Sequence, residues 1–357
     1  MKKTILALAV PALLAAGVTN AATVYNNDGT TIDLKGSIRL KMEKVDSKDV
    51  DLKDDSSRIG VGIKHDLGNG LSALGYYEMG YDTQKQGSSQ ITNRLGYAGF
   101  SMNDIGTLTF GRVTAPFDDV AVSDYSYIYG GVMDFGRMED ASTGNGILDK
   151  NNFLARVSNT MKVESAQYNG FSAAASYSFG TNGDRVDANG NATEGNLDNA
   201  YTLAAFYESD FGLTFNAGYG HGKSTGAVGI ESQDLDIWGL GAQYQIADFS
   251  FALDYGQAKL DSNIAGQDKY KADLLGLGAK YQVIPQSSLY AGYYLRDYKD
   301  QLVDNADKNE VYVAGVDYQF TKNVVTFIEY AYDKTSYANN QASEADNKGS
   351  LGLRVYF

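Results

Sequence analysis

The sequence predicts an all-β fold: a transmembrane, antiparallel, up-and-down β-barrel of sixteen strands with an inward-folded third loop. Three observations lead to this fold class. Apolar and polar side chains alternate along most of the chain, with little helical periodicity. The polar connections between the alternating segments are short and long in turn. The last alternating segment ends on Phe357, an aromatic residue.

The N-terminal residues have the layout of a secretory signal peptide. Lys2 and Lys3 form a positive start, residues 5–17 are mostly apolar, and small residues follow up to Ala21. Such a run is shorter than the roughly 20 residues that a transmembrane helix needs. We therefore expect a signal peptide that is cleaved at Ala21 or Ala22. Proline is scarce and no linker interrupts the rest, so residues 22–357 are predicted to form one barrel domain.

The strands are placed by their alternation. In the first, Ile32, Leu34 and Ile38 share one face, while Asp33 and Arg39 lie on the other. A face this charged suits a water-filled lumen, with the apolar face turned to lipid. The sixteen predicted strands are 31–44, 56–66, 71–81, 93–101, 106–112, 153–164, 171–179, 199–208, 212–222, 234–246, 249–259, 270–283, 287–298, 309–320, 324–333 and 349–357.

The connections support this count. Seven are short and eight are long, which makes fifteen links between sixteen strands. An even number brings both chain ends to the side of the short turns, where the last strand can pair with the first. Closure matters because an unpaired strand edge finds no water in lipid. The long links are 45–55, 82–92, 113–152, 180–198, 223–233, 260–269, 299–308 and 334–348.

The third long link, residues 113–152, is much the longest, and loops of that length usually have a function. We expect it to fold into the lumen and narrow the channel. It is rich in acid, and the candidates for the acidic side of the constriction are Asp118, Asp119 and Asp124.

Arginines with lumenal parity are the candidates for the opposite, basic wall. Arg58, Arg94 and Arg156 each lie near the start of a strand that follows a long loop, and Arg39 has the same parity on the first strand. Basic and acidic groups on opposite sides of a narrow passage create a transverse electric field. The alternative is that each arginine only binds a neighbouring loop carbonyl or carboxylate.

Composition excludes several classes of function. The net charge of −14 argues against a nucleic-acid partner and favours cations near the molecule. The absence of cysteine excludes disulfides and thiolate metal sites. The two histidines, His65 and His221, are far apart in sequence, so no metal site and no cofactor are expected. An enzyme is not expected either, since no nucleophile or acid stands out beside His221.

Four segments together resemble the general porins of the OmpF/OmpC type, with closer likeness to the OmpU-type branch: Ala22–Gly29, Tyr76–Glu78, Asn93–Gly99 and Phe110–Arg112. The resemblance covers essentially the whole mature chain. Its first segment looks like the family's mature N-terminus, which implies cleavage after Ala21 and a signal peptide over 1–21. It implies that Arg58, Arg94 and Arg156 form the family's basic cluster and that Glu78 faces the lumen. It also implies a family arginine at Arg112, at the start of the constriction loop, as a further candidate for the basic wall.

The loop tip departs from that family. The family pattern is Pro-Glu-Phe-Gly-Gly, whereas this chain has Tyr127, Ile128, Tyr129, Gly130 and Gly131. Asp124 matches the aspartate that precedes the tip in the family, but the tip glutamate is absent, and Ser37 replaces a lumenal lysine. The transverse field is therefore expected to be rearranged, and ion selectivity cannot be carried over.

These observations predict an outer-membrane general diffusion porin for small hydrophilic solutes and ions, with a cation preference. The resemblance implies a homotrimer, contact with outer-membrane lipid and lipopolysaccharide, and barrel-assembly machinery that reads Phe357. An adhesin or receptor that acts through the long acidic loops is the alternative. The strand count disfavours a specific sugar channel, although Tyr127 and Tyr129 favour a mild preference of that kind.

Overall fold

The computed structural model describes residues 21–46, 48–84, 91–132, 153–180, 196–225, 232–262, 269–300, 306–337 and 343–357. The expected signal peptide, up to residue 20, and residues 133–152 of the third loop lie outside these ranges. Within them, no helix has both the length and the apolar composition to cross a membrane.

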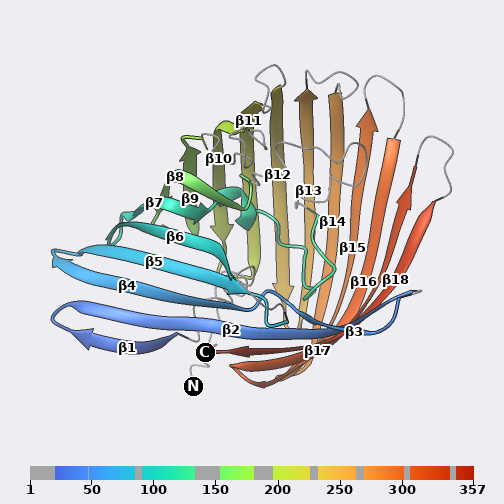
Figure 1. The fold of residues 1–357 in the computed structure, drawn as a ribbon, viewed down its shortest axis with the longest axis horizontal. Helices are drawn as coiled ribbons and strands as arrows, with labels where there is room; N and C mark the ends of the chain where they lie inside the picture. Colours follow the sequence, from blue (N-terminus) through green and yellow to red (C-terminus); the bar gives the residue numbers. More distant parts are fainter. Residues whose placement is uncertain are drawn as a thin grey trace, which may run out of the picture.

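Sixteen strands form a closed antiparallel ring, as the sequence predicts (Figure 1). Each strand pairs with the next, and the last pairs with the first. The ring consists of β2 (Thr30–Val45), β4 (Arg58–Gly68), β5 (Leu71–Tyr81), β6 (Ile91–Met102), β7 (Gly106–Thr114), β8 (Arg156–Ser165), β9 (Phe171–Ser178), β10 (Asn196–Glu208), β11 (Leu213–Thr225), β12 (Ser232–Ile246), β13 (Phe249–Ser262), β14 (Lys269–Ile284), β15 (Ser287–Asp300), β16 (Ala306–Thr321), β17 (Val324–Ser336) and β18 (Glu344–Tyr356).

Two short strands were not expected. β1 (Ala22–Asn27) and β3 (Asp51–Asp54) both pair with β2, β1 on the edge that β18 also uses and β3 on the edge that β4 also uses. β1 lies along the first part of β2, and β3 lies along its last part, inside what the sequence suggests is a loop. Both are too short to show a clear alternation, and their hydrogen-bonding partner is β2.

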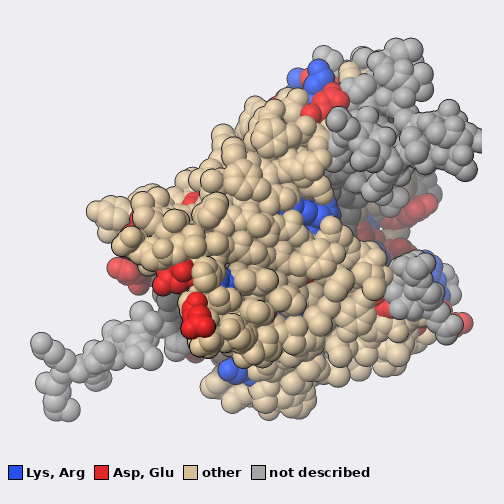
Figure 2. Space-filling view, turned by 60° about the vertical axis from the view of Figure 1, so that its left-hand side comes forward, with Lys and Arg blue, Asp and Glu red and all other residues tan. Residues whose placement is uncertain are grey.

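The two faces of the barrel have opposite chemistry. On the outer face, Ile38 and Met42 of β2 are exposed, as are Leu351 and Leu353 of β18. Figure 2 shows that much of the outer surface seen from the side of β4–β9 carries no charge. An apolar surface of this extent would be a liability in water. It suits strands that face lipid.

The C-terminal residue closes the seam between the last strand and the first. The N–H of Gly36 donates to the carbonyl of Phe357 at 2.7 Å, and the N–H of Phe357 donates back at 3.0 Å. The ring of Phe357 covers Gly36 so closely that a Cβ there would lie 2.5 Å from Cζ. Glycine at this position therefore lets the terminal aromatic ring pack across the seam.

The wall of the barrel is low on one side and tall on the other. β7, β8 and β9 have 9, 10 and 8 residues, whereas β12, β14 and β16 have 15, 16 and 16. In Figure 1 the strands from β11 to β18 form the tall side.

The tall side carries a belt of charged pairs on its outer face, near the ends of the long loops. Outward-facing lysines pair with carboxylates on the same or neighbouring strands. The pairs include Lys259–Asp261 at 2.8 Å, Lys299–Asp273 at 2.8 Å and Lys308–Glu310 at 3.0 Å. Charges on the lipid face are costly at the membrane centre. This belt therefore has to lie beyond the hydrocarbon, and the tall wall extends outside the bilayer.

Candidate functional site: the third loop and the arginine cluster

The third loop folds inward, as the sequence predicts. Its described part begins where β7 ends, forms a short 3-10 helix, η3 (Pro116–Asp119), and then follows the inner face of the tall wall. Val122 bonds to Asp254 on β13, and Tyr127 bonds to Glu329 on β17. The loop therefore crosses the lumen along the side opposite β4–β8.

Two buried carboxylates of the wall fasten the loop. Glu329, 1% exposed, accepts the N–H groups of Tyr127, Ile128 and Tyr129 at 2.8, 3.1 and 2.9 Å. It also accepts the hydroxyl of Tyr290 at 2.9 Å. A buried carboxylate is tolerated only with such partners, and bonds to a charged acceptor are strong. Glu329 therefore fixes the position of the loop tip.

Asp254 repeats this arrangement earlier in the loop. It accepts the N–H of Val122 at 2.8 Å and both the N–H and the hydroxyl of Ser123, at 2.9 and 2.5 Å. Further along, the carbonyl of Gly131 accepts a bond from Arg296 of β15. The loop is thus held at several points from β13 to β17.

The wall lacks side chains where the loop rests on it. Lumen-facing glycines on β11, β12 and β14 leave no room for a Cβ. At Gly218 a Cβ would lie 2.4 Å from Val120 Cγ2, and at Gly241 it would lie 2.2 Å from the Val120 carbonyl. At Gly278 it would lie 2.0 Å from the carbonyl oxygen of Ser123. At Gly241 and Gly278 the backbone of the loop therefore packs directly on the backbone of the wall.

The two tip tyrosines are fixed by packing. The ring of Tyr127 stacks on Phe327 at 4.3 Å, and its hydroxyl donates to Asp317 at 3.1 Å. Burial and Asp317 raise the pKa of the Tyr127 hydroxyl. Tyr129 is buried and donates to Glu43 at 3.0 Å. Both rings serve to anchor the loop, which does not favour a sugar-binding role for them.

The tip glycines are required by the turn that the tip makes. A Cβ at Gly130 would lie 2.0 Å from Asp124 Oδ1, and Gly131 has a φ of +95°. Residues with a side chain rarely adopt that backbone angle, so glycine is favoured there. Both glycines thus let the chain turn back over Asp124.

The three acidic residues of the loop have different surroundings, and only Asp124 lies at the attachments to the tall wall. Asp124 accepts the N–H of Ser126 at 2.9 Å and the hydroxyl of Tyr294 at 3.2 Å. Asp119 has Lys162 and Glu164 of β8 as charged neighbours. Burial raises the pKa of Asp119, while Lys162 opposes that rise. Asp118 is exposed on η3. Their role as the acidic side of the constriction stays a prediction.

The arginines expected on the basic wall come together in space. Arg58 on β4 has Arg39, Arg94 and Arg156 as charged neighbours. β4 and β8 are separated by three strands, and adjacent strands lie about 4.8 Å apart. Arg58 and Arg156 can therefore interact only through the lumen. Glu78 lies within the same group, and its Oε1 is 2.7 Å from Arg94 Nε.

A further arginine in this group was missed by the sequence reasoning. Arg354 on β18 is the cross-strand partner of Arg39. Its Nη2 lies 2.6 Å from Asp55 and 2.7 Å from the carbonyl of Tyr127, and its guanidinium lies over the Tyr127 ring. The polar parity of Arg354 in the last strand was the available signal. We define the arginine cluster as Arg39, Arg58, Arg94, Arg156 and Arg354.

Arg112 occupies a different position. It alternates with Val113, which is 1% exposed and packs against the loop, and shares the parity of the exposed Phe110. Its Nε donates to the carbonyl of Arg94 at 3.0 Å, and its Nη1 donates to Ser158 at 3.0 Å. Alternation therefore places Arg112 on the outward side of β7, next to the cluster.

His221 has an acidic partner that the sequence did not reveal. Its Nδ1 lies 2.9 Å from Asp236, directly across from it on β12. The hydroxyl of Tyr219 also donates to Asp236. All three side chains alternate with lumenal glycines or buried apolar residues, so they belong to the outer face. Among the described residues, no group of three or more His, Cys, Asp or Glu side chains is arranged to hold a metal ion.

Known proteins resemble this chain over its whole length. A family model described as Gram-negative porin matches residues 7–338. The major outer membrane protein of Pasteurella multocida is 32% identical, with 100% of both chains covered. Outer membrane protein U of Vibrio vulnificus is 32% identical over 71% of this chain and 67% of its own.

Solved structures show the same fold at lower identity. The anion-selective porin from Comamonas acidovorans superposes with a TM-score of 0.76, at 19% identity, covering 92% of this chain and 100% of its own. OmpT of Vibrio cholerae, in its trimer form, gives a TM-score of 0.71 at 21% identity, with the same coverage. Barrel, inward loop and relatives agree, and the chain belongs to the Gram-negative porin family.

Proposed function

We propose that the protein is a general diffusion porin of the outer membrane, which lets small hydrophilic solutes and ions cross. The observation that carries this is the third loop, held against one wall of a sixteen-stranded ring. A barrel of that size encloses an aqueous channel, and the loop narrows it. The fold and family support a channel and not an enzyme, and the expectation of no catalysis stays a prediction.

Planar-bilayer recording tests this function. We expect a large, ohmic, steady conductance that appears as three equal steps for each inserted trimer. Silence in the bilayer, from a barrel whose folding is verified by its heat-modifiable migration in SDS gels, would favour the adhesin or receptor alternative.

We further propose that the pore prefers cations, because the chain carries a net charge of −14. The arginine cluster opposes this preference at the constriction. It faces the third loop, whose tip it contacts through Arg354. Asp118, Asp119, Asp124 and Glu78 supply the acidic groups of the same region.

Removing an arginine of the wall is expected to increase the cation preference. Arg94→Ala and Arg156→Ala each delete a positive charge from the lumen, so the potassium-to-chloride permeability ratio should rise on the order of twofold. Reversal potentials in a salt gradient measure this ratio. Lys44→Ala, on the outward side of β2, is the control. Unchanged reversal potentials in both arginine variants would place the cluster away from the ion path.

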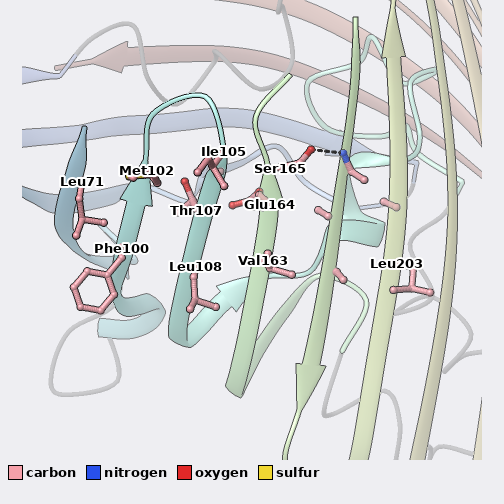
Figure 3. Close-up of a pocket in the computed structure, with 15 residues that line it drawn as sticks. Leu71, Phe100, Met102, Ile105, Thr107, Leu108, Val163, Glu164, Ser165 and Leu203 are labelled. Atoms are coloured by element: carbon pink, nitrogen blue, oxygen red, sulfur yellow. Dashed lines mark hydrogen bonds between the residues drawn. The ribbon is translucent and has the colours of Figure 1, made fainter. Parts of the chain in front are cut away.

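We propose a homotrimer, supported by the family and by the trimeric form of the Vibrio cholerae relative. An apolar groove of about 580 Å³ on the outer face of the low wall is the candidate contact (Figure 3). Phe100, Leu108, Val163 and Leu203 line it, together with small alanines of β9. Cross-linking in native membranes should yield trimers, and Ala175→Trp at the groove should reduce them.

The remaining partners follow from the outer face and the two chain ends. The charged belt of the tall wall is suited to the headgroup region of the outer leaflet, where we propose contact with lipopolysaccharide. Phe357 is proposed as the signal for barrel-assembly machinery, and residues 1–21 as the export signal. Outer-membrane fractionation of the full chain tests both assignments.

A further inference from the structure

We propose that the arginine cluster is a binding site for small multivalent oxyanions, such as inorganic phosphate, within the channel. This inference rests on the proposed diffusion function and adds a class of ligand to it. Selectivity by charge alone needs no bound solute, whereas this site would hold one during passage.

The charge of the cluster is only partly compensated. Five arginines converge from β2, β4, β6, β8 and β18. Glu78 contacts Arg94, and Asp55 contacts Arg354. Arg39 and Arg58 bond to neutral groups: Arg39 Nε donates to Ser37 Oγ at 2.8 Å, and Arg58 Nε donates to the Ser56 carbonyl at 3.2 Å.

The hydrogen bonds that orient Arg39 and Arg58 leave the Nη edge of each guanidinium group available for binding an anion. In Arg39 and Arg58 the anchoring contact is made by Nε. Among the described residues, neither uses its Nη groups in a hydrogen bond. Arg94 likewise meets Glu78 through Nε. A planar guanidinium binds an oxyanion through two parallel N–H groups, and the Nη pair supplies them.

The cluster is also half-buried, which strengthens the repulsion among its positive charges and so favours binding of an anion. The arginine side chains are partly shielded from water, at 15% exposure for Arg94 and 12% for Arg354. Like charges repel more strongly where the dielectric is low. A bound dianion would relieve the repulsion among several guanidinium groups at once, which chloride does less well.

Surrounding acid does not cancel this local field. Charges farther away than about 8–10 Å are screened at physiological ionic strength. A chain of net charge −14 therefore holds a basic patch at the narrow part of its channel without neutralising it. The site and the overall cation preference are compatible, because one acts at the constriction and the other at the mouths.

The test is single-channel recording in potassium chloride with potassium phosphate added at pH 8 and constant ionic strength. Potassium succinate serves as a second probe. We expect a saturating fall in conductance with both, half complete in the millimolar range. Arg58→Ala and Arg39→Ala should each weaken the effect about tenfold. Arg58→Lys keeps the charge without the paired donors and should give an intermediate result.

Lys64→Ala is the matched control, since Lys64 lies on the same strand and the same face as Arg58, away from the cluster. It should leave the phosphate effect unchanged. No saturating effect in the wild-type channel, or an effect in both Arg39→Ala and Arg58→Ala as strong as in the wild type, would overturn the oxyanion site and leave the diffusion function standing. Absence of any conductance in potassium chloride would instead reject the diffusion function.

Discussion

Replacing Glu329 with alanine is expected to detach the tip of the third loop and to lower the mean conductance at least twofold. The substitution leaves the N–H groups of Tyr127, Ile128 and Tyr129 without their shared acceptor. An unsatisfied buried donor costs about 1–3 kcal/mol, so the tip should leave the wall to find water in the lumen. Single-channel recordings should show a smaller, noisier open state.

The control for this variant is Glu310→Ala, which removes a carboxylate from the outer face of the neighbouring strand β16. It should conduct like the wild type. Glu329→Gln retains one acceptor oxygen and should fall between the two. A quiet Glu329→Ala channel of wild-type conductance would show that the remaining attachments, Asp254 among them, suffice to hold the tip.

Adding a single methyl group at Gly278 is expected to move the loop as strongly. In Gly278→Ala the new Cβ would lie 2.0 Å from the carbonyl oxygen of Ser123. That contact is between the new Cβ of the wall and a backbone atom of the loop, so no side-chain rotation relieves it. Overpacking of this kind costs about 1–3 kcal/mol. The loop should shift into the lumen, reducing conductance about twofold while the barrel stays folded.

Gly62→Ala is the matched control, because it adds the same methyl group to a lumenal glycine of β4 whose nearest neighbour would be 3.7 Å away. Folding of both variants is checked by heat-modifiable migration in gels. Equal conductance in Gly278→Ala and Gly62→Ala would mean that the loop does not press on β14.

The ring strands could be predicted because membrane burial imposes a simple pattern. Residues that face lipid, such as Ile38 and Leu353, must be apolar whatever their neighbours in the sequence. The turns at one end of the barrel are short, which marks where strands end. The short strands β1 and β3 obey no such rule. They are stabilised by pairing with β2, which only the assembled sheet supplies.

Parity was less reliable near the arginines. Strict alternation from a lumenal Arg94 predicts that Tyr97 and Gly99 face away from the lumen, yet Gly99 is buried and Tyr97 packs against the lumenal core. Likewise, alternation from a lumenal Arg156 predicts that Val157 faces away from the lumen, yet Val157 is 4% exposed and belongs to that core. Register shifts on β6 and β8 insert an extra residue before the regular pattern begins. Such bulges reset the face of every residue beyond them.

The attachments of the third loop were beyond sequence reasoning for another reason. Glu329 and Asp254 have the lumenal parity of any polar wall residue, and nothing local distinguishes them. Their partners lie 200 and about 130 residues away in the chain. Arg354 was similarly visible only as an alternating polar residue, because Asp55 and Tyr127 reach it through the folded barrel.

The seam between β18 and β2 determines how the barrel can assemble and insert into the membrane. Val45 pairs with Lys348, so the contact that completes the wall joins residues about 300 positions apart. Until the last strand arrives, the edge of β2 from Ser37 to Val45 has no partner, and lipid offers none. Pairing between such distant segments is slow. Insertion should therefore be all-or-none. A chain that lacks only its final strand should fail to enter the bilayer, although the sequences of all its other strands are unchanged.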